Sequence, residues 1–302
     1  MPQTAFLFPG QGAQTVGMAG ALCAALPAAA DLFRRASAVL GYDLLDACVP
    51  GPAEKLNATD VSQPAIFVAS LAALEQLKAT EPDALHGVVA TAGLSLGEYT
   101  ALAFAGALAF EDGVRLVQAR GRAMQAAAEA TPSGMISVLG SEVPAVEALV
   151  AEARGGDTLE VANLLCPGNT VVSGSLAALD RFEARCGQKG GLRTVRLAVA
   201  GAFHTNLMKP ADEALAAALA SAPLAAPTVP VWSNVDAKPH TDPAEIRALL
   251  VKQVLSPVRW EDTLRGLFEA GVDRFYEVGP GRVLAGLLKR VQRKADVRNV
   301  TA

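Results

Sequence analysis

A serine at position 95 lies between two glycines, in the sequence Gly93-Leu94-Ser95-Leu96-Gly97. The largely apolar residues 87–92 before it predict a buried strand, and residues 98–104 after it predict a helix. A strand, a G-x-S-x-G pattern and a helix in this order are typical of a nucleophile elbow, a sharp turn that exposes a reactive serine. A helix-capping serine in a glycine-rich turn is the alternative, and the two glycines favour the elbow. The pattern indicates covalent acyl chemistry without naming a reaction.

A serine hydroxyl needs a base within hydrogen-bonding distance, and the chain has three histidines. His86 precedes the strand that leads to Ser95, so we expect it at the opposite edge of the sheet. His240 follows Lys238-Pro239 in a polar loop. His204 follows an apolar strand, at the carboxyl edge where open α/β sheets place their sites. We therefore predict His204 as the base; a surface histidine that caps a helix is the weaker alternative.

An acyl-transfer site also needs two donors for the oxyanion of its tetrahedral intermediate. The N–H group of Leu96, the residue after the nucleophile, is one candidate. The loop Pro9-Gly10-Gln11-Gly12 follows a short predicted strand, and Gln11 can supply the second. Loss of one such donor typically costs about 3–4 kcal/mol in the transition state.

The elements that must position these residues alternate between strands and helices, which predicts an α/β fold with a parallel sheet covered by helices. We expect strands at residues 4–8, 87–92, 229–232, 275–278 and 297–300. We expect helices at residues 63–77, 98–104, 111–130, 204–220, 243–255, 261–270 and 283–291. The helix at residues 63–77 carries an apolar face of Ile66, Ala69, Leu71, Leu74 and Leu77.

The middle of the chain has a different pattern. Between residues 134 and 199 we expect the order β-α-β-β-α-β, with strands at 135–139, 159–162, 170–173 and 192–197 and helices at 143–153 and 176–185. This is the ferredoxin-like order. The sequence thus predicts a large α/β domain of residues 1–131 and 200–302, into which a ferredoxin-like small domain of residues 132–199 is inserted.

Composition narrows the function class. Of 302 residues, 51% are hydrophobic and 19% charged, with a net charge of −4, which indicates a globular chain without a general basic field. Without such a field we expect no nucleic acid as partner. We also expect no membrane partner, because no apolar run is long enough to span a bilayer. The N-terminus lacks a basic region before its apolar residues, so we interpret it as mature protein.

The four cysteines are dispersed, at positions 23, 48, 166 and 186. They lack C-x-x-C spacing, which favours reduced thiols in a cytoplasmic or plastid-like compartment. With only three scattered histidines, we expect no metal site and no other cofactor. Cys166 lacks an elbow or an adjacent basic residue, so we interpret it as a structural thiol.

Taken together, five motifs resemble the malonyl-CoA:acyl carrier protein transacylases, and the resemblance covers essentially the whole chain. The motifs are Phe8-Pro9-Gly10-Gln11-Gly12-Ala13-Gln14, Gly93-Leu94-Ser95-Leu96-Gly97-Glu98-Tyr99, Gln118-Ala119-Arg120-Gly121 with Met124-Gln125, Gly201-Ala202-Phe203-His204, and Gln253 before Pro257-Val258-Arg259-Trp260. Several independent motifs in register are far more specific than the elbow alone.

The resemblance implies a ping-pong transfer. Ser95 takes the malonyl group from malonyl-CoA and passes it to the phosphopantetheine thiol of an acyl carrier protein, with His204 as base. It also implies that the backbone carbonyl of Gln253 orients the imidazole and that Arg120 binds the malonyl carboxylate. A guanidinium offers paired donors that fit a carboxylate. On residue pattern alone, Arg120 reads as a solvated helix arginine. The sequence Gly201-Ala202-Phe203-His204 resembles the malonyl-selective form of the family.

The chain departs from the family at Leu94, where many relatives have histidine, and in residues 163–169, where many have a second asparagine and a glutamine. An acidic carrier protein needs a local basic patch on this acidic chain. The candidates are Lys189, Arg193, Arg259, Lys289, Arg290, Arg293 and Lys294. Three alternatives remain: a serine esterase, a malonyl transferase that serves a polyketide pathway, and a non-catalytic scaffold.

Overall fold

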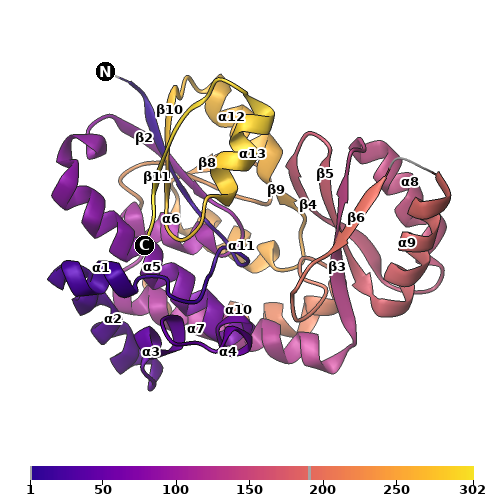
Figure 1. Cartoon of the computed structure of the whole chain (residues 1–302), viewed down its shortest axis with the longest axis horizontal. Coiled ribbons are helices and arrows are strands. Elements are labelled where there is room, and N and C mark those ends of the chain that lie inside the picture. Colours follow the sequence, from indigo (N-terminus) through magenta and orange to yellow (C-terminus); the bar gives the residue numbers. More distant parts are fainter. Residues whose placement is uncertain (1, 190–191) are drawn as a thin grey trace.

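The computed structural model describes residues 2–189 and 192–302. These residues form two β-sheets and the helices that pack around them (Figure 1). The larger sheet has the strand order β11-β10-β1-β2-β7-β8. Its strands are β1 (Thr4–Phe8), β2 (Val88–Gly93), β7 (Val231–Trp232), β8 (Pro239–His240), β10 (Arg274–Val278) and β11 (Asp296–Val300). All neighbours pair in parallel except β8, which pairs antiparallel with β7 at one edge. The predicted parallel α/β sheet is therefore present.

Strand β1 shows why this sheet is buried on both faces. Phe6 and Phe8 belong to the hydrophobic cluster on one face, and Ala5 and Leu7 belong to the cluster on the other. Successive side chains of a strand point to opposite faces, so β1 must be covered twice. It is apolar from Ala5 to Phe8 and buried throughout.

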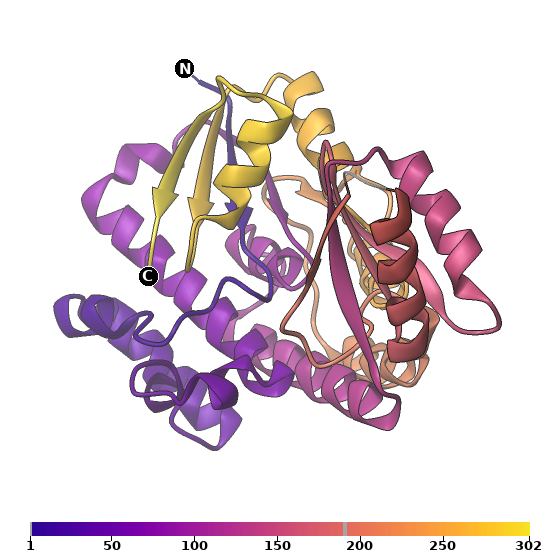
Figure 2. The same cartoon turned by 45° about the vertical axis from the view of Figure 1, so that its right-hand side comes forward.

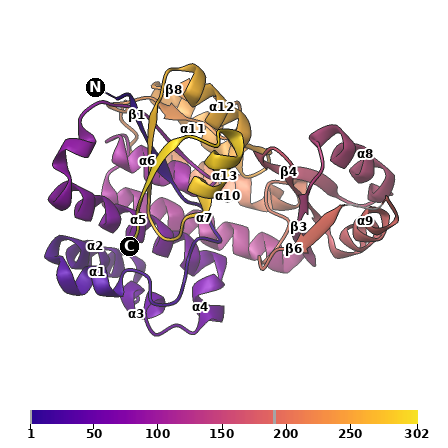
Figure 3. The same cartoon turned by 45° about the horizontal axis from the view of Figure 1, so that its top comes forward.

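The helices lie on both faces of the larger sheet and beyond it (Figure 3). They are α1 (Gly20–Ala25), α2 (Pro27–Leu40), α3 (Leu44–Cys48), α4 (Ala53–Asn57), α5 (Thr59–Thr80), α6 (Gly97–Phe104), α7 (Phe110–Ala130), α8 (Val143–Arg154), α9 (Leu176–Lys189), α10 (Lys209–Ser221), α11 (Pro243–Gln253), α12 (Trp260–Glu269) and α13 (Val283–Val291). Short 3-10 turns occupy Pro82–Leu85 and Asn206–Met208. No helix of the described ranges is both long and apolar enough to cross a membrane.

The smaller sheet has the strand order β6-β3-β5-β4-β9. Its strands are β3 (Ser133–Leu139), β4 (Leu159–Cys166), β5 (Asn169–Ser175), β6 (Arg193–Arg196) and β9 (Val258–Arg259). Ile136 and Val172 pack in the cluster that α8 and α9 complete, while the adjacent Met135 and Val171 line a cavity on the opposite face. Figure 2 shows α8 and α9 on the side of this sheet that faces away from the larger sheet.

Some predicted elements differ from the structure. The helix expected from His204 begins at Lys209, because a loop and a 3-10 turn intervene. The strand expected at 229–232 has only two residues, Val231 and Trp232, and the strand expected at 159–162 continues to Cys166. The two-residue strands β8 and β9 were not predicted. Helix α5 contains the helix expected at 63–77 and buries the five apolar residues predicted to share a face, and it is longer and buried around more of its circumference than that face alone requires.

Candidate active site

Ser95 lies at the turn between β2 and α6, with a backbone φ of 51°. This left-handed conformation is strained for a residue with a Cβ atom. The flanking glycines make the turn possible: a Cβ at Gly93 would overlap the backbone of Gly97 and Glu98, and one at Gly97 would overlap the backbone of Phe8. The predicted strand, turn and helix are thus present, with the serine in a strained position.

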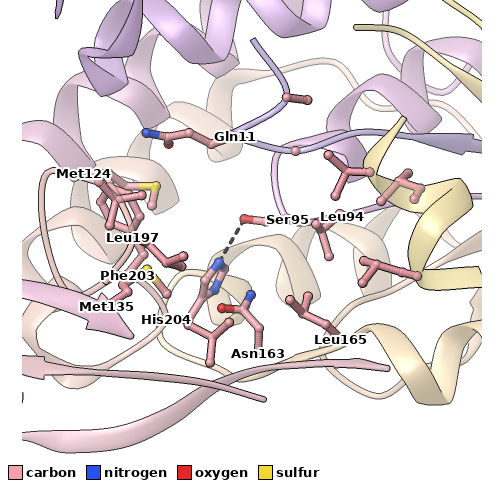
Figure 4. Close-up of a pocket in the computed structure, with 18 of the residues that line it drawn as sticks. Gln11, Leu94, Ser95, Met124, Met135, Asn163, Leu165, Leu197, Phe203 and His204 are labelled. Atoms are coloured by element: carbon pink, nitrogen blue, oxygen red, sulfur yellow. Dashed lines mark hydrogen bonds between the residues drawn. The ribbon is translucent and has the colours of Figure 1, made fainter. Parts of the chain in front are cut away.

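The Ser95 hydroxyl lies 2.9 Å from Nε2 of His204. The dashed line in Figure 4 marks this contact. The Nδ1 atom of the same imidazole lies 2.9 Å from the backbone carbonyl oxygen of Gln253. A carbonyl oxygen only accepts hydrogen bonds, so Nδ1 carries the hydrogen and Nε2 presents its lone pair to Ser95. Burial, together with the nearby Arg120 cation, lowers the pKa of His204 to about 4. The imidazole is therefore neutral and able to accept a proton near pH 7.

The other two histidines lie away from Ser95. His86 is exposed, near Asp83 before β2. His240, on β8, lies within hydrogen-bonding distance of Asp236 and Glu245. Of the three histidines, only His204 lines the cavity that contains Ser95. Like Ser95 it has a positive φ, 61°, so both facing residues lie in left-handed turns.

Arg120 projects from α7 and is 1% exposed, so the solvated reading of this arginine was wrong. Its guanidinium donates to the Ser95 hydroxyl at 2.9 Å, to Gln63 Oε1 at 2.9 Å and to Gln253 Oε1 at 3.0 Å. All three partners are uncharged oxygens. Its Nε atom has no hydrogen-bond partner within the described residues. A buried cation with neutral partners can bind an anionic group.

Gln253 is the last residue of α11 and contacts four residues at the site. Its backbone carbonyl accepts from His204, and its side-chain oxygen accepts from Arg120. Its side-chain nitrogen donates to the Ser95 carbonyl at 3.0 Å and to Glu98 Oε2 at 2.7 Å. The family resemblance implied a role only for its backbone carbonyl. The side chain also connects the serine turn to the arginine.

The two expected oxyanion donors lie beside Ser95. Leu96 is fully buried and precedes the first turn of α6. Gln11 lines the same cavity as Ser95, and Figure 4 shows it on the side of the serine opposite His204. The Gln11 side chain reaches Thr59 at 3.4 Å. Within the described chain, neither backbone N–H donates a hydrogen bond, so both are free to donate to an external oxygen.

The cavity around Ser95 has a volume of about 190 Å³ and lies between the two sheets. Leu94 and Gln11 contribute from the larger sheet, and Met135, Leu165 and Val171 contribute from the smaller one. Leu94 and Leu165 add apolar surface to this cavity. Cys166 is buried in the adjacent apolar cluster, and burial raises the pKa of its thiol.

Sequence reasoning missed Asn234, Glu98 and Gln63 as neighbours of the reacting groups. Asn234 follows the short strand β7, at the carboxyl edge of the parallel sheet. Functional sites of open α/β sheets lie at this edge, so a polar residue there was a candidate for the site. Glu98 belongs to the elbow motif itself and is 2% exposed. Buried acids are rare, but burial cannot be read from an isolated glutamate at the start of a helix. Gln63 reaches Arg120 from another helix.

Comparisons with known proteins identify the family. The model of the acyl transferase domain matches residues 5–302. The mitochondrial malonyl-CoA-acyl carrier protein transacylase of Mus musculus is 44% identical, over 96% of this chain and 79% of that protein. The malonyl-CoA:acyl carrier protein transacylase structure from Xanthomonas oryzae has a TM-score of 0.95 and 41% identity, covering 100% of this chain and 95% of that one.

A third relative was solved in complex with a carrier protein. It is a malonyl-transacylase bound to its type II polyketide synthase acyl carrier protein, with a TM-score of 0.93 and 38% identity, covering 99% of this chain and 96% of that one. In both solved structures the structural agreement covers 99% or more of this chain. The chain belongs to the malonyl-CoA:acyl carrier protein transacylase family.

Proposed function

We propose that this chain transfers the malonyl group of malonyl-CoA to the phosphopantetheine thiol of acyl carrier protein, for fatty-acid synthesis. The observation that carries the proposal is the joint contact of His204 and Arg120 with the Ser95 hydroxyl. A nucleophile with a neutral base and a buried cation at hydrogen-bonding distance fits an acyl group that carries its own carboxylate.

In the first half-reaction, Ser95 Oγ attacks the thioester carbonyl and its proton passes to His204 Nε2. The oxyanion accepts hydrogen bonds from the backbone N–H groups of Leu96 and Gln11. The carbon–sulfur bond then breaks, and the departing coenzyme A thiolate takes the proton from His204. In the second half-reaction the carrier thiol repeats these steps on the malonyl ester, and the Ser95 hydroxyl is restored.

Arg120 provides the selectivity for malonyl in this proposal. The malonyl carboxylate accepts hydrogen bonds from the guanidinium and replaces the Ser95 hydroxyl among its partners. An acetyl group leaves the cation without a charged partner. Sites built to pair a polar group can reject analogues that lack it by about 10⁴-fold or more.

We propose that the carrier protein docks beside the N-terminal end of α13. Val283, which lines the cavity and is 45% exposed, lies at the opening, and Lys289, Arg290, Arg293 and Lys294 are exposed further along. Among the other basic candidates, Lys189 pairs with Glu152 and Arg259 pairs with Asp262. An acidic carrier surface complements such exposed cations.

We propose the domain organisation expected from the sequence: an α/β-hydrolase-like domain of residues 1–131 and 200–302, and an inserted ferredoxin-like domain of residues 132–199. The element order β3-α8-β4-β5-α9-β6 and the strand order of the smaller sheet support it. We also propose a cytoplasmic location, with reduced thiols, because all four cysteines are free and buried.

The decisive experiment is mass spectrometry of the intact chain after brief incubation with malonyl-CoA. We expect one malonyl adduct on Ser95, its discharge by acyl carrier protein that carries phosphopantetheine, and no adduct on the Ser95→Ala variant. Absence of an adduct on the unaltered chain would refute the transferase. Rapid loss of the adduct to water without a carrier would instead support the esterase.

The alternative acceptor is a carrier protein of a polyketide synthase. A specific observation favours testing it, because a relative of almost the same fold was solved with such a carrier. Transfer rates to fatty-acid and polyketide carriers, measured side by side from the malonylated chain, decide between them. We expect faster transfer to the fatty-acid carrier.

A further inference from the structure

Asn234 holds the backbone of the serine turn on both sides of its sharpest point. Its Oδ1 atom accepts the N–H of Ser95 at 2.5 Å, and its Nδ2 atom donates to the carbonyl of Gly93 at 2.8 Å. Asn234 is fully buried and follows β7, the parallel neighbour of β2. The sharp turn leaves the Ser95 N–H and the Gly93 carbonyl without partners in the strand or the helix. The amide side chain of Asn234 supplies a partner for each of them.

Glu98 in turn holds Asn234. Its Oε2 atom accepts the backbone N–H of Asn234 at 3.0 Å and the side-chain nitrogen of Gln253 at 2.7 Å. Glu98 is buried and is not among the residues that line the cavity containing Ser95, so it does not face a group bound there. Its contacts are with the residues that hold the reacting groups.

Gln253 extends this connection to the base and the cation. The same side chain that donates to Glu98 donates to the Ser95 carbonyl and accepts from Arg120, and its backbone holds His204. We propose that Glu98 and Asn234 are positioning residues, which together with Gln253 fix Ser95, His204 and Arg120 relative to one another. This inference rests on the proposed role of Ser95 as nucleophile.

The physical reason is the strain at Ser95. A residue with a φ of 51° needs surrounding contacts that impose the conformation. A misplacement of about 1 Å between reacting atoms can cost about 10²-fold in rate. Because the acceptor oxygen of Glu98 serves two donors from different segments, its removal frees both the turn and Gln253. The expected effect is on the rate of serine attack rather than on substrate affinity.

Three variants test the proposal. Glu98→Met keeps the side-chain length and removes both acceptor oxygens. Glu98→Gln keeps one carbonyl oxygen, which can accept from Asn234 and Gln253. Asn234→Ala removes the side chain that pairs with Ser95 and Gly93. As the structural control, Thr91→Val removes a different buried hydrogen bond of β2, from Thr91 Oγ1 to the carbonyl of Phe6 at 2.9 Å.

Two reactions of Ser95 are measured with the full-length variants. The first is the single-turnover rate of malonyl-Ser95 formation across malonyl-CoA concentrations, which separates rate from affinity. The second is labelling by a fluorophosphonate, in which Ser95 Oγ bonds to phosphorus, fluoride leaves and His204 takes the proton. The second reaction reports on the serine turn even if malonyl-CoA is not the substrate, so the two proposals fail independently.

We expect Glu98→Met and Asn234→Ala to slow both reactions by about 10²-fold, with half-saturating malonyl-CoA changed less than threefold. For Glu98→Gln we expect both reaction rates to stay within about threefold of those of the parent. Thr91→Val should lower the melting temperature but leave both reaction rates at the parental values. Parental labelling rates for Glu98→Met and Asn234→Ala would overturn the proposal. Loss of rate in Thr91→Val equal to that in Asn234→Ala would also overturn it, because destabilisation alone would then be the cause. If Glu98→Met does not fold, Asn234→Ala and Glu98→Gln carry the same comparison.

Discussion

Arg120 combines burial, positive charge and uncharged partners beside the Ser95 hydroxyl. Burial lowers the pKa of its guanidinium, but an arginine keeps its charge in proteins. Its position over the ring of Tyr99, 5.5 Å from guanidinium carbon to ring centroid, adds a cation–π contact. These contacts hold the group in place without neutralising it.

Replacing this cation should change selectivity more than stability. In Arg120→Ala we expect kcat/KM for malonyl-CoA to fall by about 10³-fold or more and the preference over acetyl-CoA to disappear. The matched control is Arg115→Ala on the same helix, whose side chain is 60% exposed and pairs with Asp112. Competition assays with the two acyl-CoA substrates measure the ratio, and a retained malonyl preference in Arg120→Ala would contradict the assignment.

His204 should remain neutral far below the range of a free imidazole. Its pKa of about 4 follows from burial and from the nearby Arg120 cation. An NMR titration, with the His204 signal assigned by the His204→Gln variant, should show no protonation between pH 5.5 and 8. A midpoint near 6.5 would mean that the ring is solvated. In Arg120→Ala the midpoint should rise, because a repelling charge is gone.

At this scale the sequence predicts well what local pattern determines. The G-x-S-x-G spacing identifies Ser95, and comparison of three histidines selects His204. Arg120 needed the family resemblance, because nothing local distinguishes it from Arg115 or Arg122. Asn234 lies 139 positions from Ser95 in the chain. No periodicity links residues so far apart.

The element that matters most is the unit formed by β2, the Ser95 turn and α6. The first turn of α6 follows β2 so closely that Gly93 lies against Gly97. Gly97 in turn lies against the backbone of Phe8, at the end of β1. The strand, the turn and the helix therefore have little freedom to change separately. Packing at two glycines, rather than helix or strand propensity, sets the angle between them.

Gly93→Ala should therefore disrupt the turn. Its Cβ would overlap backbone atoms, which cannot rotate away, so we expect the free energy of unfolding to fall by about 3 kcal/mol or more. Gly286 in α13 provides the contrast, because a Cβ there meets nothing within 4 Å. Gly286→Ala should stabilise the chain by about 0.5–1 kcal/mol. Chemical denaturation measures both, and equal stability of the two variants would contradict the packing argument.

Sequence patterns predicted the longer elements and missed the shortest ones. The bounds of α13 agree residue for residue, since its apolar positions repeat with helical period and basic residues end it. Strands β8 and β9 have two residues each, too few for any alternation to show. They form because their backbones pair with those of neighbouring strands, β8 with β7 and β9 with β4. The 3-10 turn after His204 likewise follows from the fold around it.

At the scale of the whole molecule, one buried acid links folding to pH. Burial raises the pKa of Glu98 to about 7 from its ordinary 4.5, against the opposing effect of its hydrogen bonds and of Arg120. An unfolded chain releases this proton above pH 4.5, whereas the folded chain retains it until about pH 7. The folded state binds more protons in this interval, so the contribution of Glu98 to stability falls as pH rises through it.

Glu98→Gln should remove this dependence, because an amide does not titrate. Relative to the parent, we expect the free energy of unfolding of Glu98→Gln to rise between pH 4.5 and 7 by about 3 kcal/mol and to stay level above pH 7. Urea unfolding at matched ionic strength measures the difference. A gap between the two proteins that stays constant from pH 4.5 to 8 would show that Glu98 is ionised throughout.

A strand of only two residues, β9, connects the two sheets. β9 follows α11, the helix that ends in Gln253, yet it pairs in parallel with β4 of the smaller sheet, Asn163 with Val258 and Leu164 with Arg259. The N–H of Arg259 meanwhile donates to the carbonyl of Asn234 at 2.9 Å. A hinge motion that widened the cavity would have to break this ladder. We therefore expect the cavity to keep its shape when an acyl group binds, so that affinity carries no entropic cost of closing one sheet over the other.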